Sequence, residues 1–373
     1  MRHQTKLPLS SVQLSSLFSA ACALPLLLAF VALPACGGGD GGSGGSGATA
    51  NTGGAGGAGG AGGAGGAGGG MPAGPCDFPH DSEVMVSDAK TLTDALKAAT
   101  PGTLIHLAPG TYTGAFNLDV AGTSEKPIVL CGPREAIIDA QDLKDLIAVR
   151  VRADYQILSG FTVTNGRKGV TLQQANMVQL KGLLVHSVGE QGIQIRENSS
   201  NNTVESCEIR DTGLSDPKNA EGIYVGTAAT NWPSPDMPDA CNNTKILNNK
   251  IGPGVKTEHV DLKEGTTGGE VRGNTFDGTG ITGDDFEDSW VNVGGNAYVF
   301  ANNKGTTAPK NGFETRVAAM GWGNDNVFEN NVATVNGTGH GFFIAEGSSG
   351  NIVKCNNTAT GAMAGLSNID CTQ

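Results

Sequence analysis

The feature that most constrains this chain is an internal repeat that begins near residue 169 and continues to the C-terminus. Short apolar strands recur there with an average spacing of about 28 residues and loops of variable length. A period of this size, made of short strands without helical periodicity, is typical of a solenoid whose coils stack on one another. The first apolar residues of the repeats align as Val170, Ile193, Ile223, Val260, Val291, Phe313, Phe342 and Leu366.

A second marker recurs in phase with these strands. An Asn follows a strand-like segment at the same point of successive repeats, and Cys207 takes that point in the preceding repeat. An Asn tolerates a left-handed turn, and its amide can bond to the same amide one coil along. The constant spacing therefore predicts an internal ladder, formed by Asn249, Asn274, Asn303, Asn331 and Asn357.

A helix signal precedes the first strands. Asp88 or Thr91 could cap a short amphipathic segment that ends at Thr100-Pro101-Gly102. No further helix is obvious after it, so the chain as a whole is predicted to be all-β.

The repeats and the Asn ladder resemble right-handed parallel β-helix proteins of the pectate lyase-like superfamily. The opening, from Leu92 to Ile138, is similar to the first coils of bacterial polysaccharide lyases on that fold, through Pro109-Gly-Thr-Tyr-Thr113 and Glu125-Lys-Pro-Ile-Val129. The resemblance implies one single-stranded right-handed parallel β-helix over residues 76–373, with the short helix as its N-terminal cap. It is specific for the fold and says little about the reaction.

The N-terminal segment has a different character. Residues 1–35 combine basic residues, a short apolar run and small residues, as secretory signals do. The run ends at Cys36 and so resembles a bacterial lipoprotein signal, which would place a lipid on Cys36; an ordinary signal peptide cut nearby is the alternative. Residues 36–75 are then a Gly/Ala/Ser-rich disordered linker. We expect an exported protein, either secreted or anchored to the cell envelope or cell surface, that contacts the membrane through the lipid alone.

The overall charge limits the ligands. A net charge of −12 and a pI near 4.9 argue against nucleic acid. An acidic polysaccharide would need a local basic patch or a bridging cation. We expect the chain to act as a monomer.

The cysteines of the exported part suggest disulfides. The sequence alone allows 15 pairings of six cysteines. Pairing neighbours in chain order gives Cys76–Cys131, Cys207–Cys241 and Cys355–Cys371.

One strand carries an acid and an amine together. In the stretch that runs to Gly265, the residues His259, Asp261 and Lys263 should point to one face. Stacking the repeats in register, at about 4.8 Å per coil, surrounds this strand with other polar residues. The predicted patch consists of Arg196, Tyr224, Asp261, Lys263, Asn292, Glu314 and Arg316.

Long insertions flank the same strand. Asp211–Glu221 and Gly278–Ser289 lie on either side of it in the sequence, and Thr227–Ala240, which contains Trp232, would add a third wall. Long loops beside a polar strand face favour a cleft.

The patch has two interpretations. Mixed charges on a sheet can simply pair with each other. Alternatively, a base could remove the proton next to a uronate carboxylate while positive charge stabilises the intermediate. Lys263 is then the catalytic base, neutral through burial and the nearby Arg316, and Arg316 pairs with the substrate carboxylate. Substrate contacts would come from Arg196, Tyr224, Asn292, Glu314 and Trp232.

The segment Asp261-Leu-Lys263 is similar to the pattern of lysine-base, calcium-dependent pectate lyases. The resemblance implies a calcium site, and Ca²⁺ takes several oxygen ligands. Gly283-Asp-Asp285 departs from that pattern, because it lies several residues before its strand. The candidate ligands are Asp261, Glu221, Glu264, Asp284, Asp285 and Asp288.

These features predict a polysaccharide lyase-like protein that cleaves a pectate-like, uronic-acid-containing chain by β-elimination in a groove on the parallel sheet. A non-catalytic glycan-binding or structural surface protein is the first alternative. A polygalacturonase-type hydrolase is the second, suggested by Gly283-Asp-Asp285 and Gly339-His-Gly341; it would need paired carboxylates at the scissile bond.

Overall fold

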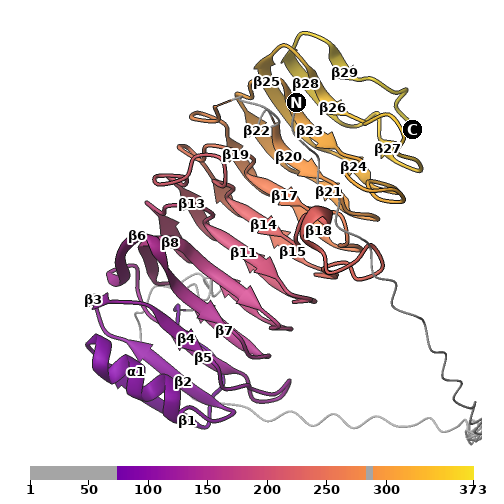
Figure 1. Cartoon of the computed structure of the whole chain (residues 1–373). Helices are drawn as coiled ribbons and strands as arrows, with labels where there is room; N and C mark the ends of the chain where they lie inside the picture. The colour runs from indigo at the N-terminus through magenta and orange to yellow at the C-terminus, as the bar shows by residue number, and fades with distance from the viewer. Residues whose placement is uncertain (1–73, 283–288) are drawn as a thin grey trace, which may run out of the picture. The chain divides into compact units, whose positions relative to one another are not determined.

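Residues 74–282 and 289–373 are described by the structure, a computed structural model, and they wind into a right-handed parallel β-helix (Figure 1). Each coil contributes short strands that pair in parallel with the coils before and after it. The predicted fold class is confirmed. The leader, Cys36 and the linker up to residue 73 lie outside the described residues. Within the described ranges, no helix is long and apolar enough to cross a membrane.

Three stacks of strands form the walls of the solenoid. The first sheet has 11 strands in the order of the chain, which are β1 Ser82–Val86, β2 Thr103–Leu107, β5 Ile128–Cys131, β7 Gln156–Ser159, β9 Gln179–Lys181, β12 Thr203–Glu205, β15 Lys245–Leu247, β18 Glu270–Arg272, β21 Val299–Ala301, β24 Val327–Glu329 and β27 Ile352–Val353.

The second and third sheets share two long strands, β6 Ala136–Val151 and β8 Thr162–Gln173, which run through both. The second sheet continues with β3 Gly110–Thr113, β10 Leu184–His186, β13 Glu208–Arg210, β16 Lys250–Ile251, β19 Thr275–Asp277, β22 Lys304–Thr306, β25 Val332–Gly337 and β28 Thr358–Ala362. The third sheet contains β4 Phe116–Leu118, β11 Ile193–Arg196, β14 Ile223–Val225, β17 Val260–Leu262, β20 Ser289–Val293, β23 Asn311–Thr315, β26 His340–Phe343 and β29 Gly365–Ser367.

Helix α1, Ala89–Ala98, caps the N-terminal end of the solenoid, as predicted (Figure 1). The Asp88 side chain accepts a hydrogen bond from the Thr91 N–H, and the Thr91 side chain accepts one from the Asp88 N–H. This reciprocal capping box satisfies backbone donors that the first turn would otherwise leave open. Leu92 and Leu96 are buried on the face that covers the first coil.

The predicted register of the third sheet is confirmed from Val170 to Phe342. Residues of this column pair coil by coil and are fully buried. Towards the C-terminal coils it becomes aromatic, and Phe313 stacks on Phe342 at a ring distance of 5.0 Å. The prediction is wrong at the last coil, where Phe342 pairs with Ser367 and not with Leu366.

The asparagine ladder is present as predicted, and its members are buried. From Asn274 onwards, each amide oxygen accepts hydrogen bonds from the backbone N–H and the amide of the preceding Asn, as Asn303 does from Asn274 at 2.9 and 3.0 Å. Each amide also donates to a backbone carbonyl of the neighbouring coil, as Asn303 does to Val271 at 2.8 Å. Cys207 continues the ladder, since its N–H donates to the Asn249 amide oxygen at 2.8 Å. From Cys207 to Asn357, each coil is therefore bonded to the next at one fixed point.

Two of the three predicted disulfides are present, Cys76–Cys131 and Cys355–Cys371. The third is wrong, because Cys207 and Cys241 are free and buried. Cys207 follows β12, whereas Cys241 precedes β15, the strand that pairs with β12. They lie at opposite ends of adjacent strands, and a disulfide needs Cα atoms within about 7 Å. Burial raises the pKa of the Cys207 thiol to about 12 and keeps it protonated.

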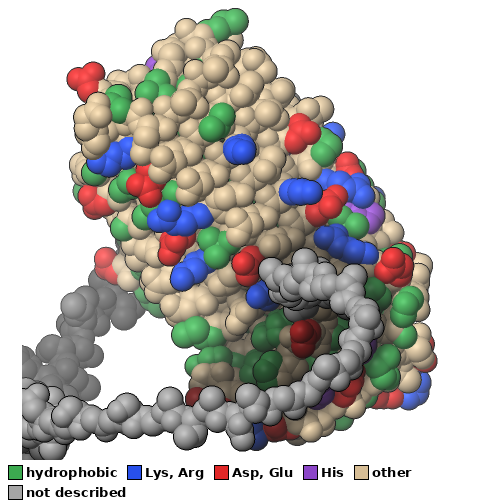
Figure 2. Space-filling view, turned by 180° about the vertical axis from the view of Figure 1, so that it is seen from behind, with side chains coloured by type: hydrophobic (Ala, Val, Ile, Leu, Met, Phe, Trp, Pro, Cys, Tyr) green, Lys and Arg blue, Asp and Glu red, His purple; other side chains and the backbone are tan. Residues whose placement is uncertain are grey.

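Charged side chains on the outside of the solenoid pair locally. Arg152 binds Asp119 at 2.8 Å, and Arg272 binds Glu270 at 2.7 Å. Figure 2 shows cationic and anionic side chains beside one another over much of the visible face.

Replacing Asn303 by Ala should destabilise the protein by about 2–4 kcal/mol, because buried donors and acceptors of three coils lose their partners. Urea unfolding followed by circular dichroism measures the effect. The control is Asn117→Ala, which changes an exposed Asn on β4. Equal midpoints for the two variants would show that the ladder does not hold the coils together.

Candidate active site

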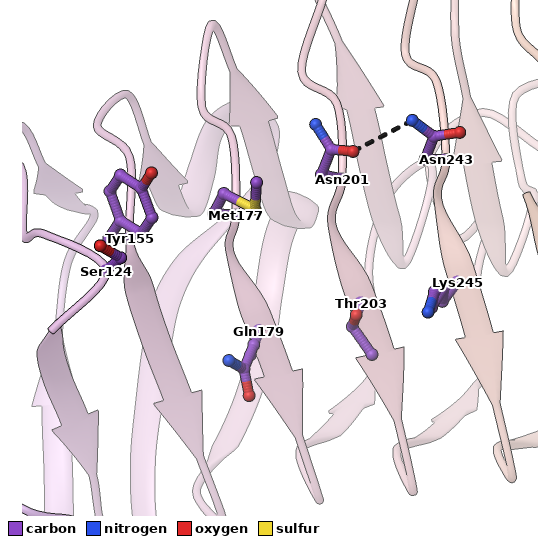
Figure 3. Close-up of a pocket in the computed structure, with 8 residues that line it drawn as sticks. All are labelled: Ser124, Tyr155, Met177, Gln179, Asn201, Thr203, Asn243 and Lys245. Atoms are coloured by element: carbon purple, nitrogen blue, oxygen red, sulfur yellow. Dashed lines mark hydrogen bonds between the residues drawn. The ribbon is translucent and has the colours of Figure 1, made fainter. Parts of the chain in front are cut away.

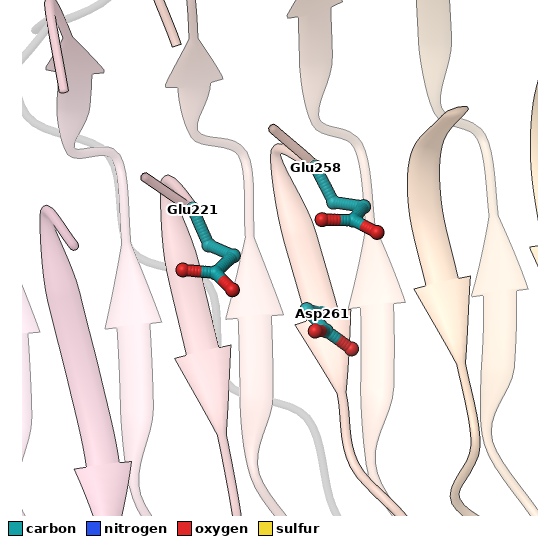
Figure 4. A group of neighbouring side chains, drawn as sticks. All are labelled: Glu221, Glu258 and Asp261. Atoms are coloured by element: carbon teal, nitrogen blue, oxygen red, sulfur yellow. The ribbon is translucent and has the colours of Figure 1, made fainter. Parts of the chain in front are cut away.

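Three buried carboxylates from two adjacent coils meet on the third sheet. Glu221 precedes β14, Asp261 lies in β17, and Glu258 precedes β17. One oxygen of each lies within 4.8 Å of the others, and Figure 4 shows the three carboxylates facing one another. Glu221 and Asp261 were predicted from the sequence as metal ligands, and the structure brings them together.

Glu258 was not among the metal ligands predicted from the sequence. It occupies the same place in its coil as Glu221, because the Gly222 N–H donates to the Glu258 carbonyl just as the Gly192 N–H donates to the Glu221 carbonyl. Extending the strand register backwards by two residues would have revealed it.

The same column continues towards the N-terminus with buried polar residues. Gln191 donates its amide to the Glu221 carboxylate at 2.9 Å. The Gln191 oxygen in turn accepts a hydrogen bond from the Lys168 ammonium, which also pairs with Glu190 at 3.0 Å. Because the Gln191 oxygen accepts from the Lys168 ammonium, the Gln191 NH₂ group is the end that faces Glu221. This arrangement fixes the orientation of the Glu221 carboxylate.

Lys263 lies beside the carboxylates. Its ammonium contacts Asp261 at 2.6 Å and sits 5.2 Å from the centre of the Tyr224 ring. Burial alone would lower the pKa of Lys263, but the Asp261 carboxylate, followed by Tyr224 and Glu221, raises it overall. The expectation of a neutral Lys263 is therefore wrong for this arrangement of the site, in which the lysine holds its proton.

The pKa values of two of the carboxylates are raised as well, which for an acid favours the neutral form. Burial and the Asp261 charge raise the pKa of Glu221 to about 7. The same two causes, with Glu221 as a third, raise the pKa of Glu258 to about 8. Three acids in so small a volume cannot all ionise without a compensating positive charge beyond Lys263.

The donor set fits a hard cation such as Ca²⁺. Three carboxylates converge, and the Asn292 amide donates to Glu258 at 3.2 Å while its own buried oxygen has no hydrogen-bond partner. An amide oxygen is the kind of atom that Ca²⁺ takes as a ligand.

A cleft of about 200 Å³ opens next to this cluster. Asp261, Lys263, Asn292 and Arg316 line it together, as the register predicted. The segment 228–230 forms one wall, held by a hydrogen bond of 2.6 Å from the Ala229 N–H to the Glu264 carboxylate. Glu264 thus lines the cleft and holds a loop, but it is not part of the carboxylate cluster.

The other predicted substrate-binding residues lie near the cleft. Arg196 and Trp232 line an adjoining pocket of about 550 Å³ on the other side of the 228–230 segment. Glu314 accepts a hydrogen bond from Asn311 at 2.8 Å. The remaining predicted metal ligands, Asp284, Asp285 and Asp288, lie outside the described residues, as does Gly283 of the hydrolase-like segment.

The surroundings of Trp232 and His259 differ from what the sequence predicted. Trp232 packs edge-on against Trp322 at 6.2 Å, which joins the loop after β14 to the loop after β23; Trp322 was not anticipated. His259 does not share a face with Asp261 and Lys263. It is fully buried, packs on Phe276, and lies 3.0 Å from the Asp277 carbonyl. His259 is not among the residues that line the cleft, and burial lowers its pKa to about 4.

The chain is similar in sequence and structure to known right-handed β-helix lyases. Residues 79–231 match the family described as Pel9A-like, right-handed beta-helix region. The crystal structure of an alginate lyase from Paenibacillus sp. str. FPU-7 is 30% identical, with a TM-score of 0.74, covering 78% of this chain and 99% of that one. Pectate lyase Pel9A is 17% identical, with a TM-score of 0.58, over 76% and 80% of the chains. A rhamnogalacturonan lyase is 13% identical, with a TM-score of 0.51, over 76% and 83%. No curated protein shows significant sequence similarity.

The raised pKa values of Glu221 and Glu258 predict how stability depends on pH in the absence of divalent cations. Between about pH 4.5 and pH 8 the folded protein keeps protons on these groups that the unfolded chain releases. The free energy of unfolding in EDTA should therefore fall as the pH rises through this window. Urea titrations at pH 5, 6.5 and 8 measure the slope.

The double variant Glu221→Gln/Glu258→Gln serves as the comparison, since neither amide titrates. It should be markedly less sensitive to pH over the same range. A wild-type protein that gains stability from pH 5 to pH 8 in EDTA would contradict the prediction.

Proposed function

The chain belongs to the polysaccharide lyase-like right-handed β-helix proteins, and on that premise we propose that it cleaves a uronic-acid-containing polysaccharide by β-elimination. The observation that supports this reaction best is the cleft in which Lys263 and Arg316 lie together beside buried carboxylates. Alginate is the first substrate to test, because the relative that is 30% identical over nearly its whole length is an alginate lyase. Pectate, the substrate class expected from the sequence, is the second.

β-Elimination makes specific demands on the residues of the cleft. A base removes the proton on the carbon next to the uronate carboxylate, the bond to the glycosidic oxygen breaks, and that oxygen takes up a proton. Lys263 is the base and Arg316 the partner of the substrate carboxylate, where negative charge accumulates. Burial raises the pKa of Tyr224, so its phenol stays protonated and can donate to the departing oxygen from beside Lys263.

Calcium has a place in this scheme. Glu221, Glu258 and Asp261 would hold it, with the Asn292 oxygen as a further ligand. When bound, it would offset the charge of Asp261, which now retains the proton on Lys263, and would add positive charge near the substrate carboxylate.

The cellular setting is proposed from the leader alone. Residues 1–35 would direct export, Cys36 would carry a lipid, and the Gly-rich linker would tether the monomeric β-helix to the cell envelope.

A second candidate function is glycan binding without cleavage. The ion pair between Lys263 and Asp261 favours it, because a protonated lysine cannot accept a proton.

Incubation with alginate, pectate and chondroitin in the presence of calcium should produce the ultraviolet absorbance of unsaturated uronate ends with at least one of them. Lys263→Ala should lower kcat by at least about 100-fold, because it removes the base. The exposed Lys250→Ala on β16 is the matched control and should behave like wild type.

Three outcomes would contradict the proposal. Bound glycan without absorbance would favour the binding protein, and new reducing ends without absorbance would favour a hydrolase. Full activity of Lys263→Ala would exclude this residue as the base.

Calorimetric titration of the EDTA-treated protein should detect calcium binding, and Glu258→Gln should weaken it by about tenfold or more through loss of a charged ligand. Glu346→Gln changes an exposed carboxylate elsewhere and should leave the affinity unchanged. Equal affinity of Glu258→Gln and wild type would remove Glu258 from the ligand set.

A further inference from the structure

A groove of about 420 Å³ lies on the first sheet (Figure 3). The Lys263 cleft lies on the third sheet. Two rows of side chains form most of it. One row stands in the turns that lead into β7, β9, β12 and β15, and the other stands on the strands. The turn row consists of Tyr155, Met177, Asn201 and Asn243, the strand row of Gln179, Thr203 and Lys245, and Ser124 closes one end.

The turn row has a left-handed backbone, which recurs in many turns of this solenoid. Its four residues all have left-handed φ angles, with 56° at Tyr155 and 57° at Met177. In the four following coils the same place is held by small or turn-forming residues. Large side chains are uncommon in this conformation, which costs about 1–3 kcal/mol where it is held under strain. The residues of the following coils are Gly268, Ala297, Asp325 and Gly350.

The contrast points to function. The chain places Tyr155 and Met177, the two bulkiest residues of this column, only in coils that line the groove. Left-handed residues such as Gln141, Ser187 and Thr307 occur in other turns, so the groove is marked by the side chains of its turn row and not by the backbone conformation alone.

The chemistry of the lining suits a sugar polymer that bears carboxylates. Amides, hydroxyls and a phenol ring line the groove with one cation, Lys245, and no carboxylate, although the chain carries a net charge of −12. Asn243 donates to the Asn201 oxygen at 3.0 Å, as the dashed line in Figure 3 marks, and the other hydrogen-bonding atoms of both amides remain for a ligand. The Lys245 ammonium is half-exposed, 3.9 Å from the Glu270 carboxylate.

We propose that this groove is a second, non-catalytic binding site for the acidic polysaccharide. It crosses four coils, about 14 Å at ~4.8 Å per coil, so that a linear polymer lying along the solenoid axis meets a new set of side chains at each coil. Lys245 pairs with a uronate carboxylate, the amides bind hydroxyls, and Tyr155 supplies a flat face for a sugar ring. The identity of the ligand rests on the proposed function; the groove and its lining residues do not.

The test uses the Lys263→Ala protein, so that the polymer stays intact. Into it are introduced Tyr155→Asn, Met177→Asn and Lys245→Gln together. Affinity electrophoresis in gels that contain alginate or pectate should show at least tenfold weaker binding. Because Asn is favoured in the left-handed conformation, the urea midpoint should stay equal or rise, which separates lost binding from lost folding. The matched control is Lys304→Gln, which removes an exposed lysine on β22 of the second sheet and should bind as the Lys263→Ala parent does.

Weaker binding of the triple variant with an unchanged or higher urea midpoint supports the groove. Binding equal to that of the parent overturns it while leaving the proposed function intact. A parent that binds no acidic polysaccharide overturns both.

Discussion

The hydrogen bond between one asparagine amide and the next is the interaction on which this structure depends. Each amide inside the ladder both accepts from the Asn before it and donates to the Asn after it, as Asn303 does between Asn274 and Asn331. Because these amides are buried, a shift of one coil by a single residue would leave several unpaired groups in the core. The ladder therefore fixes the register, and a fixed register turns residues far apart in sequence into straight columns.

The candidate site is one product of those columns. Lys168, Gln191, Glu221 and Glu258 come from four successive coils, yet they form one buried line because each stands at the same point of its coil. The line ends at Asp261, where three carboxylates and one ammonium share a small volume. The site is thereby poised for a cation, since the acids are too crowded to ionise fully without one.

Sequence reasoning succeeded where the strand period governs side-chain direction. The alternation of inward and outward residues placed Asp261, Lys263 and Asn292 correctly, because parallel pairing copies the pattern from coil to coil. Sequence reasoning failed in the turns, because the alternation ends there. Glu258 was not predicted as a member of the carboxylate cluster. His259 was predicted to face the cleft, but it points into the core. The disulfide prediction failed at Cys207 for a related reason, since chain order does not say which end of a strand a cysteine occupies. The charge of Lys263 depends on a contact of 2.6 Å that no spacing rule contains.

The two disulfides have a consequence for how the protein can come apart. In a solenoid each coil touches only its neighbours, so the end coils have one neighbour fewer and are the natural starting points for unravelling. Cys76–Cys131 fastens the first coils and Cys355–Cys371 fastens the last. The two disulfides therefore oppose unfolding from either end, whether a mechanical force or a protease acting on a frayed end causes it. An end coil can then detach only together with the loop that its disulfide closes.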